Sequence, residues 1–310
     1  MVASLEKVLI TGVAGFIGSN LADYLLREGY EVVGIDNLSY GLQEQIPTAV
    51  EFHKIDIRSK DIYPIFNNID FVFHFAAKNS IIDCQDDPVE TSDINVMGSV
   101  NVFEAAKRAD VKKVIYAETS ALYEGSKIMP TPETEEHPES YYAVSKLAER
   151  LFAESYSRWF GMKMTALRYF NVYGPRQDYR RTIPPVICAF IIKLLKGERP
   201  TIYGEGTKKR DFIYVDDVNS FHLLTLKKSA TDNKVFNIGS GVNYSILELY
   251  AIIAKLLKSD IQPKYEDDLP GEAEENLADI SSALELDWKP EYTIEDGLKE
   301  SIKYIRENVV

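Results

Sequence analysis

A glycine-rich turn near the start of the chain constrains the fold more than any other feature. Residues 7–11 are apolar and lead into Gly12, residues 16–28 have the periodicity of an amphipathic helix, and residues 31–36 are again apolar and β-branched. This order indicates a strand, a tight turn, a helix and a second strand. Because strands joined through a crossover helix pair in parallel, we expect the chain to begin with one unit of a parallel sheet.

The same alternation continues as far as residue 168. We expect further strands at 50–56, 70–76, 113–117 and 164–168, and helices at 94–109 and 142–160. Alternating strands and helices are typical of a doubly wound α/β fold, so the pattern predicts a Rossmann sheet covered on both faces. Beyond Asn171, glycines and prolines separate short segments. This texture indicates a smaller C-terminal α/β lobe with loops around a binding site.

Composition excludes several classes of partner. The chain has 310 residues, 45% of them hydrophobic and 27% charged, as in a folded globular protein. Its 35 basic and 48 acidic side chains give a net charge of −13. Such a charge repels nucleic acids and anionic membranes, so we expect neither as a partner. An anionic small molecule would need arginine or lysine placed locally.

Cysteine and histidine usage argues against a metal or a disulfide framework. Cys84 and Cys188 are the two cysteines, and the four histidines have no metal-ligand spacing. The N-terminus has only a short apolar run, and the longest later one, residues 186–192, is shorter than a membrane span. We therefore expect a cytoplasmic protein without a metal.

The glycine-rich turn has the spacing of a dinucleotide site. Gly12 allows the sharp turn, Gly15 lets the backbone approach a pyrophosphate, and Gly18 allows close packing of helix on strand. Asp36 follows Gly18 at the end of the second strand, where a carboxylate accepts hydrogen bonds from the adenosine ribose. A carboxylate there repels a 2′-phosphate, which favours NAD over NADP. The alternative is that Asp36 only shapes a turn at the strand end.

A tyrosine and a lysine spaced four residues apart are candidates for acid–base chemistry. Tyr142 and Lys146 lie on one face of the expected helix. Tyr123 and Lys127 have the same spacing, but Gly125 between them indicates a loop. A neighbouring ammonium and a positive nicotinamide ring both favour the phenolate, so Tyr142 could act as a general base.

A second group must fix the hydroxyl on which that base acts. Thr119 and Ser120 follow the strand at 113–117, at the carboxyl edge where open α/β sheets bind ligands. Thr119 is our candidate, and the alternative for both residues is a local turn.

The motifs together resemble the extended short-chain dehydrogenase/reductase superfamily over nearly the whole chain. Within it the chain looks most like the nucleotide-sugar 4-epimerases that act on UDP-hexoses. The matching segments are residues 11–18, 36–39, 74–77, Asn95, 119–123, Tyr142 with Lys146, 168–177, 204–206, 210–217, 236–241 and 277–279.

The resemblance implies a function for each matching residue. Thr119, Tyr142 and Lys146 form the catalytic set. The NAD site is lined by Gly12, Gly15, Phe16, Ile17, Gly18, Asp36, Asn37, Asp56, Ile57, Phe75, Ala76, Ala77, Asn95, Thr119, Tyr142, Lys146 and Phe170. The nucleotide-sugar site includes Thr119, Tyr142, Asn171, Ile183, Tyr203, Arg210 and Asn276. Asn171 and Arg210 match positions that hold the diphosphate, although Arg210 could instead pair with Asp211 or Asp216.

The resemblance also implies an organisation. An NAD-binding domain takes residues 1–171 with a returning segment at about 211–238, and a nucleotide-sugar-binding lobe takes 172–210 and 239–310. The helices at 95–109 and 142–160 correspond to those that join two subunits in a four-helix bundle, so we expect a homodimer.

Several departures from the family pattern narrow the reaction. Family dehydratases have an acidic pair after the threonine, and decarboxylating relatives a glutamate, where this chain has Ser120 and Ala121. Leu269 stands where an arginine is common, which leaves the nucleotide base open. Asn276, where residue size decides whether an N-acetylated sugar is admitted, is intermediate. Glu118 is unusual, and the sequence indicates no role for it.

The sequence thus predicts an NAD-dependent UDP-hexose 4-epimerase that works through a 4-keto sugar. Two alternatives remain open. One is a related nucleotide-sugar enzyme, such as a reductase or a uronic-acid epimerase. The other is a non-catalytic NAD-binding sensor, which would not need Thr119, Tyr142 and Lys146 together.

Overall fold

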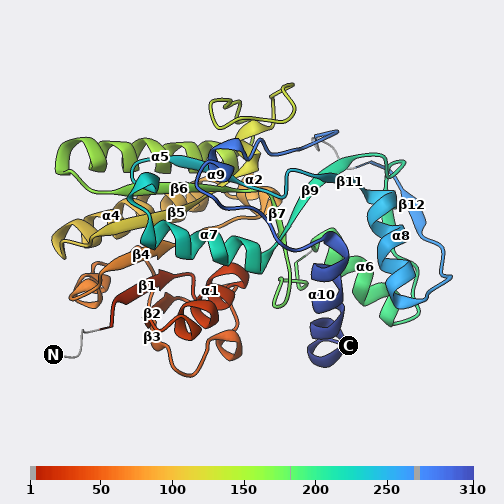
Figure 1. Cartoon of the computed structure of the whole chain (residues 1–310), viewed down its shortest axis with the longest axis horizontal. Coiled ribbons are helices and arrows are strands. Elements are labelled where there is room, and N and C mark those ends of the chain that lie inside the picture. The colour runs from red at the N-terminus through yellow and green to blue at the C-terminus, as the bar shows by residue number, and fades with distance from the viewer. Residues whose placement is uncertain (1–4, 182, 269–272) are drawn as a thin grey trace. The chain divides into compact units, whose positions relative to one another are not determined.

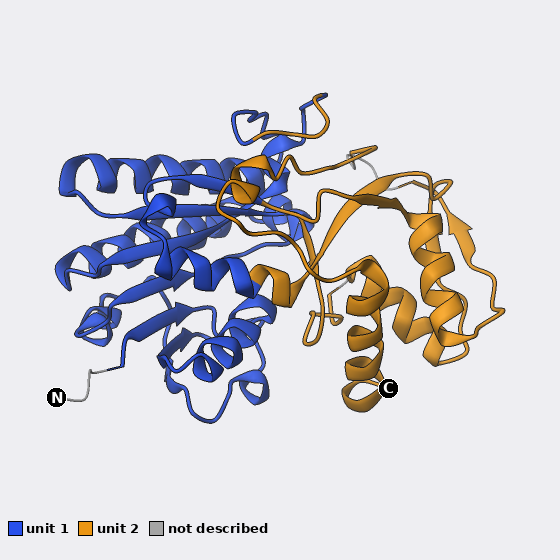
Figure 2. Cartoon of the chain, in the orientation of Figure 1, with its two compact units in different colours: residues 1–127, 133–169, 219–237 blue, residues 128–132, 170–218, 238–310 orange. Residues whose placement is uncertain are grey.

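The computed structural model describes residues 5–181, 183–268 and 273–310 (Figure 1). The chain forms two compact units (Figure 2). Unit 1 consists of residues 1–127, 133–169 and 219–237, and unit 2 of residues 128–132, 170–218 and 238–310. The returning segment of unit 1 therefore begins later than the expected residue 211. No feature of the sequence indicated that residues 128–132 leave unit 1.

A seven-stranded sheet forms the centre of unit 1, in the order β10–β6–β5–β4–β1–β2–β3. Strands β1 to β6 pair in parallel. The strands are β1 (Lys7–Thr11), β2 (Glu31–Asp36), β3 (Glu51–Lys54), β4 (Phe71–His74), β5 (Lys113–Thr119), β6 (Met164–Tyr169) and β10 (Val235–Ile238). The order reverses between β1 and β4, as in a Rossmann sheet, so the doubly wound α/β fold is confirmed. Ligands of such sheets bind at the carboxyl ends of the strands beside this reversal.

Helices connect these strands. Among them α4 and α5 lie side by side (Figure 1). The helical segments of unit 1 are α1 (Phe16–Arg27), η1 (Gln43–Gln45), η2 (Lys60–Phe66), α2 (Ile81–Asp86), α3 (Pro88–Ser92), the π-helical η3 (Asp93–Gly98), α4 (Ser99–Arg108), η4 (Ser120–Tyr123), α5 (Tyr141–Phe160), η5 (Ser229–Thr231) and most of α7 (Val215–Lys227). The single helix expected at 94–109 thus begins with a wider π-helical turn.

The ends of α5 are fixed by local chemistry. The Ser140 hydroxyl accepts a hydrogen bond from the Ala143 N–H at 3.1 Å, which caps the first turn. Gly161 ends the helix in the left-handed conformation, with φ of 69°. Tyr142 and Lys146 therefore lie in the first two turns of a well-defined helix.

The interior of unit 1 is mostly apolar. Leu9, Val33, Val72, Phe103 and Val114 are buried there, and each such side chain contributes roughly 1.5–3 kcal/mol by leaving water. Charged side chains are nevertheless buried in the same unit, which is unusual unless they are paired.

Unit 2 is built from smaller sheets and three longer helices. A three-stranded sheet has the order β11–β9–β7, and β8 pairs with β12. The elements are β7 (Asn171–Tyr173), α6 (Val186–Leu195), β8 (Thr201–Tyr203), β9 (Lys209–Tyr214), β11 (Asn243–Ser245), α8 (Ile246–Leu257), β12 (Lys264–Glu266), α9 (Ser281–Leu284) and α10 (Ile294–Asn308). Helices α6, α8 and α10 pack together. Across the described part of the chain, no helix combines the length and apolar character that a membrane crossing requires.

Candidate active site

The turn between β1 and α1 needs glycine at two positions for steric reasons. Gly12 has φ of +75°, and its N–H donates to the Ile35 carbonyl oxygen at 2.8 Å. A Cβ on Gly18 would lie 2.2 Å from the Gly12 carbonyl oxygen. Gly15 precedes α1 without a side-chain cap, so the first turn of the helix offers its N–H groups to an anion.

Asp36 ends β2 beside this turn. Its Oδ2 accepts a hydrogen bond from the Ala14 N–H at 3.0 Å, and its Oδ1 accepts from the Leu38 N–H at 2.8 Å. Burial raises the pKa of this carboxyl, and the two backbone donors oppose that rise. The carboxylate is thus aimed from β2 at the glycine turn.

A second polar group lies next to Asp36. Asn37 donates to Asp56 Oδ2 at 2.9 Å, and Arg58 binds both carboxylate oxygens of Asp56, with Nε to Oδ1 at 2.9 Å and Nη2 to Oδ2 at 2.8 Å. Arg58 holds the pKa of Asp56 well below its usual range. Ile57, the next residue, is buried. The structure therefore joins Asp56 to Asn37, next to the Asp36 that binds the glycine turn, while Ile57 lies against Gly98 of η3.

The carboxyl end of β4 lies against the same turn. The Thr11 hydroxyl oxygen accepts hydrogen bonds from the N–H groups of Phe75 and Ala76, both at 3.2 Å. Ala77 follows, and Phe16 and Ile17 lie in the first turn of α1. The ends of β1 and β4 thus meet at the reversal point of the sheet, and contact of these residues with NAD stays a prediction.

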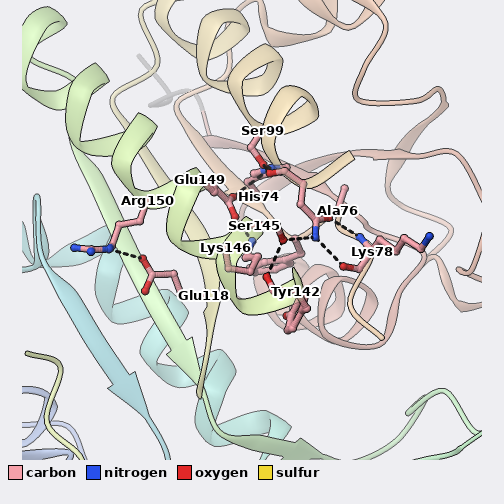
Figure 3. A network of polar contacts seen from close by, with 12 residues as sticks. His74, Ala76, Lys78, Ser99, Glu118, Tyr142, Ser145, Lys146, Glu149 and Arg150 are labelled. Carbon is pink, nitrogen blue, oxygen red and sulfur yellow. Dashed lines mark hydrogen bonds and ion pairs between the residues drawn. The ribbon is translucent and has the colours of Figure 1, made fainter. Parts of the chain in front are cut away.

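The side-chain amide of Asn95 is hydrogen-bonded to other residues of the protein. Its amide accepts from the Lys78 N–H at 2.8 Å and donates to the Lys78 carbonyl at 2.9 Å and to Ser145 Oγ at 3.0 Å. The side chain is fully buried. Asn95 therefore ties the loop after β4 to α5, where Ser145 lies between Tyr142 and Lys146 (Figure 3).

The structure brings Thr119, Tyr142 and Lys146 together. Thr119 and Lys146 both lie close enough to Tyr142 to act electrostatically on its phenol. Thr119 also accepts from the Ala121 N–H at 3.1 Å, which fixes its side chain. Burial raises the pKa of Tyr142, while Lys146 and Thr119 lower it. The phenol is thus placed where a further positive charge would favour its ionisation.

Lys146 has a partner that our sequence analysis missed. Its ammonium binds the carboxylate of Glu149, one helical turn along, and both side chains are buried. Figure 3 shows these two side chains gathered with His74. His74 Nε2 lies 3.6 Å from Glu149 Oε1. The i, i+3 spacing on α5 was the signal that could have indicated this pair.

Glu118, which the sequence left without a role, is half of a buried ion pair. Its Oε2 accepts from Arg168 Nε at 2.6 Å, and both side chains are fully buried. The hydroxyl of Tyr123 accepts from Arg168 Nη1 at 2.9 Å. Tyr123, the tyrosine of the second pair with this spacing, therefore belongs to a structural hydrogen-bond network.

In unit 2, three of the expected substrate residues lie at the ends of β7 and β9. Asn276 Oδ1 accepts from the Asp211 N–H at 2.9 Å and from Asn171 Nδ2 at 3.3 Å. Arg210 directly precedes Asp211 on β9. The Asp211 carboxylate accepts hydrogen bonds from the backbone of residues 240, 241 and 278. That carboxylate is therefore engaged with backbone N–H groups of the segments that follow β10 and precede α9.

The other expected residues of unit 2 lie on other segments of the chain. Ile183 precedes α6 and is 37% exposed, and Tyr203 ends β8. Neither shares a hydrogen bond with Asn171 or Asn276 among the described residues. Phe170 is buried, and its N–H donates to the Ile238 carbonyl. Leu269 lies outside the described residues.

The residues of unit 1 fit a dinucleotide. The glycine turn leaves no room for a Cβ, the first turn of α1 lacks a side-chain cap, and Asp36 supplies a carboxylate beside it. These are the donor, the space and the acceptor that a pyrophosphate and a ribose require.

Comparison with known proteins agrees with this geometry. Residues 8–239 match the family model described as "NAD dependent epimerase/dehydratase family". A UDP-glucose 4-epimerase of Thermotoga maritima, solved with UDP-glucose, is 36% identical, with a TM-score of 0.94 over 98% of this chain and 100% of that one. A UDP-N-acetylglucosamine 4-epimerase of Methanobrevibacter ruminantium, in complex with UDP-N-acetylmuramic acid, is 36% identical, with a TM-score of 0.95 over 99% and 100%.

A third solved structure contains the cofactor. A UDP-glucuronic acid 4-epimerase of Bacillus cereus, in complex with UDP-glucuronic acid and NAD, is 31% identical, with a TM-score of 0.89 over 97% and 99% of the two chains. The chain therefore belongs to the NAD-dependent epimerase/dehydratase family, in the nucleotide-sugar epimerase branch of the extended short-chain dehydrogenases/reductases, and NAD is its cofactor.

Proposed function

We propose that the chain is a UDP-hexose 4-epimerase that interconverts UDP-glucose and UDP-galactose and holds its NAD tightly. The observation that supports this most directly is the place of the Tyr142 phenol, which lies near the Thr119 side chain and in the field of Lys146. Ser120 and Ala121 follow Thr119 and provide no carboxylate, so elimination of water or carbon dioxide lacks its acid. Inversion at C4 without net oxidation is the remaining chemistry.

In this proposal Tyr142 moves one proton in each direction. The phenolate takes the proton of the sugar 4-hydroxyl as the carbinol becomes a ketone, and the phenol returns it after the keto sugar has presented its other face. Bound NAD supplies the acceptor and donor of hydride. Thr119 orients the sugar oxygen, and Lys146 favours the phenolate.

Asn171 and Arg210 would hold the diphosphate while the hexose turns. Arginine forms strong charge-assisted hydrogen bonds to phosphate, which is the local cation that a chain of net charge −13 needs for an anionic substrate. Tight retention of the nucleotide part and a permissive hexose site are both required for inversion.

The test is incubation of the purified protein with UDP-glucose, UDP-galactose, their N-acetylated forms and UDP-glucuronate, followed by chromatography. We expect C4 inversion of at least one plain or N-acetylated hexose without added NAD. The nucleotide released on denaturation, measured by absorbance, should be NAD. Net consumption of NAD or NADH with substrate would instead indicate a reductase.

A second candidate substrate is UDP-glucuronate. The similarity to the UDP-glucuronic acid 4-epimerase of Bacillus cereus, over nearly the whole of both chains, supports it. A chain that inverts UDP-glucuronate and none of the hexoses would replace the first proposal with this one.

We further propose that two copies of the chain associate through α4 and α5. Apolar side chains on the outer surface of α5 recur at helical spacing and are strongly exposed, namely Val144, Leu151, Phe152 and Trp159, with exposures of 42–77%. Large exposed apolar surfaces of this kind mark interfaces. The molar mass in solution should be that of a dimer, and Leu151→Glu with Trp159→Glu should reduce it to that of a monomer.

A further inference from the structure

The catalytic lysine is paired with a carboxylate that the proposed reaction does not use. The Lys146 ammonium is 3% exposed, and its partner among the described residues is Glu149, which is fully buried. Glu149 Oε1 has no hydrogen-bond partner in the described structure, although it lies 3.6 Å from His74 Nε2. A buried carboxylate with an unsatisfied oxygen is costly, so its presence beside the catalytic set calls for a reason.

His74 cannot supply the missing hydrogen bond or a charge. Its Nδ1 is 2.6 Å from Thr11 Oγ1 and its Nε2 is 2.8 Å from Ser99 Oγ, so both ring nitrogens are occupied. Burial lowers the pKa of His74 to about 3, which keeps the ring neutral. The Ser99 hydroxyl, from α4, lies beside Glu149 and donates its proton to the Asn95 carbonyl oxygen at 2.7 Å.

The remaining groups around this cluster add no net charge. From β5, Tyr116 is a buried phenol whose pKa is raised by burial, and Glu118 faces Arg168 and, at 3.9 Å, Arg150. Arg150 in turn pairs with Glu136 and Glu154. From α2, Cys84 acts on Tyr142 only if ionised, and burial raises the pKa of its thiol. The charges left uncompensated by other partners are therefore those of Lys146 and Glu149.

These two charges cancel, so Lys146 alone does not offset the negative charge of an ionised Tyr142. Above about pH 7, where Glu149 carries its charge, Lys146 is at +1 and Glu149 at −1, so ionisation of Tyr142 would leave a buried cluster with a net charge of −1. Such a charge is unfavourable in a desolvated site unless another cation is present. Without Glu149, ionisation of Tyr142 would instead neutralise Lys146.

We propose that Glu149 is a positioning residue that cancels the charge of Lys146, so that Tyr142 ionises only when the nicotinamide ring beside it is positively charged. This inference rests on the proposed use of Tyr142 as the base. Beside an oxidised ring the phenolate completes a neutral cluster and can accept the proton of the sugar hydroxyl. Beside a reduced, neutral ring the phenol is favoured and holds the proton that must return to the sugar oxygen. Glu149 thereby makes the protonation state of Tyr142 depend on whether the nicotinamide ring is oxidised or reduced.

The test is the titration of Tyr142 in the NAD-loaded protein. The tyrosinate absorbance is followed against pH in wild type and in Glu149→Gln, and the same titration with Tyr142→Phe added is subtracted from each. We expect Glu149→Gln to move the Tyr142 titration to lower pH by at least about one unit, because Glu149 raises the pKa of Tyr142 and a nearby charge shifts a pKa by roughly 1–3 units. Glu154→Gln is the matched control, since Glu154 is an exposed carboxylate on the same helix that pairs with Arg150. It should leave the titration unchanged.

A second readout separates this role from a structural one. During turnover, Glu149→Gln should accumulate reduced cofactor, visible by its absorbance, because the phenolate persists when a proton donor is needed. A folded Glu149→Gln protein whose Tyr142 titration is unmoved, or moves to higher pH, overturns the proposal. If that variant does not fold, Glu149→Asp replaces it, with a smaller shift in the same direction expected and an unmoved titration again contrary to the proposal.

The titration does not depend on the substrate. A chain that inverts none of the UDP-sugars but shows the shift would contradict the proposed function and keep the role of Glu149. A chain that inverts UDP-sugars but shows no shift would support the proposed function and contradict the role of Glu149.

Discussion

Two of the cations buried in unit 1, Arg168 and Lys146, have contrasting surroundings. Arg168 is fully buried and donates to Glu118 at 2.6 Å, to the Tyr123 hydroxyl at 2.9 Å, to the Glu133 carbonyl at 2.7 Å and also to Glu136. Lys146 is almost as deeply buried, yet Glu149 is its one ion-pair partner among the described residues. We call Arg168 with its several partners the saturated cluster, and Lys146 with Glu149 and Tyr142 the sparse cluster. A cation with many partners fixes structure, whereas the positive charge of a cation with one partner still acts on a neighbouring group.

The partners of Arg168 show what it fixes. They all belong to the end of β5 or to the segment that connects β5 to α5. That segment begins next to Thr119 and ends next to Tyr142. Arg168 therefore holds both ends of the connection between the two hydroxyls of the candidate active site, without touching either.

The largest expected effect is on chemistry at the sparse cluster. Tyr142→Phe removes the proton acceptor, so turnover should fall about a thousandfold or more. The protein should keep its fold and its NAD, because the substitution removes one hydroxyl and leaves the aromatic ring of residue 142 in place. Epimerisation kinetics and the NAD content of the purified variant check this. Turnover at the wild-type rate would eliminate Tyr142 as the base.

The next effect is on stability at the saturated cluster. Arg168→Met leaves Glu118 buried without its main cation, which should cost about 3–5 kcal/mol of unfolding free energy. Urea unfolding measures it. Arg180→Met is the control, because Arg180 binds Asp178 with its side chain 40% exposed, and exposed pairs contribute about 1 kcal/mol or less. Equal losses of unfolding free energy in the two variants would contradict the difference that we expect between a buried and an exposed ion pair.

Adding Glu118→Gln to Arg168→Met sharpens the result. The uncharged amide no longer requires a cation, so the double variant should recover part of the lost free energy. A double variant less stable than Arg168→Met alone would show that burial of the unpaired carboxylate is not the cause.

A third effect is the pH dependence of stability at the sparse cluster. Burial raises the pKa of Glu149 to about 7, above the ordinary value near 4.3. Between these values the folded protein binds more protons than the unfolded chain, so this residue makes the unfolding free energy fall as pH rises. Glu149→Gln removes that slope. The stability of the variant relative to wild type should therefore increase from about pH 4.5 to about pH 7, measured by urea unfolding. Parallel curves would contradict the burial of a charged Glu149.

What could be foreseen from the sequence was mostly local in the chain. The strands, the glycine turn and the Tyr142–Lys146 register follow from periodicity within one element, and the structure has them nearly where expected. Glu149 shares that periodicity, but its burial depends on packing of α5 against other elements, among them His74 of β4. Spacing alone cannot distinguish a buried carboxylate from an exposed one.

The contacts that were missed join distant segments. Arg168 lies 50 residues from Glu118 and 45 from Tyr123 in sequence, and Asn171 lies 105 residues from Asn276. Such pairs are set by the order of strands in the sheets, which hydrophobic patterning specifies only by class. The role of Glu118 therefore became clear only when β5 and β6 were seen as neighbours.

The smallest effect uses the two tyrosines as a matched pair, since each precedes a lysine by four residues. Tyr123→Phe removes a hydroxyl that accepts from Arg168 and donates to Asn237 Oδ1 at 2.6 Å. Because Arg168 keeps its other partners, we expect a loss of about 1–2 kcal/mol in unfolding free energy and unchanged turnover. Tyr142→Phe should show the opposite balance, with turnover lost and stability nearly kept. A folded Tyr123→Phe protein without turnover would contradict this assignment. It would mean that a place on the same helix face as Lys146 is not what makes a tyrosine the base.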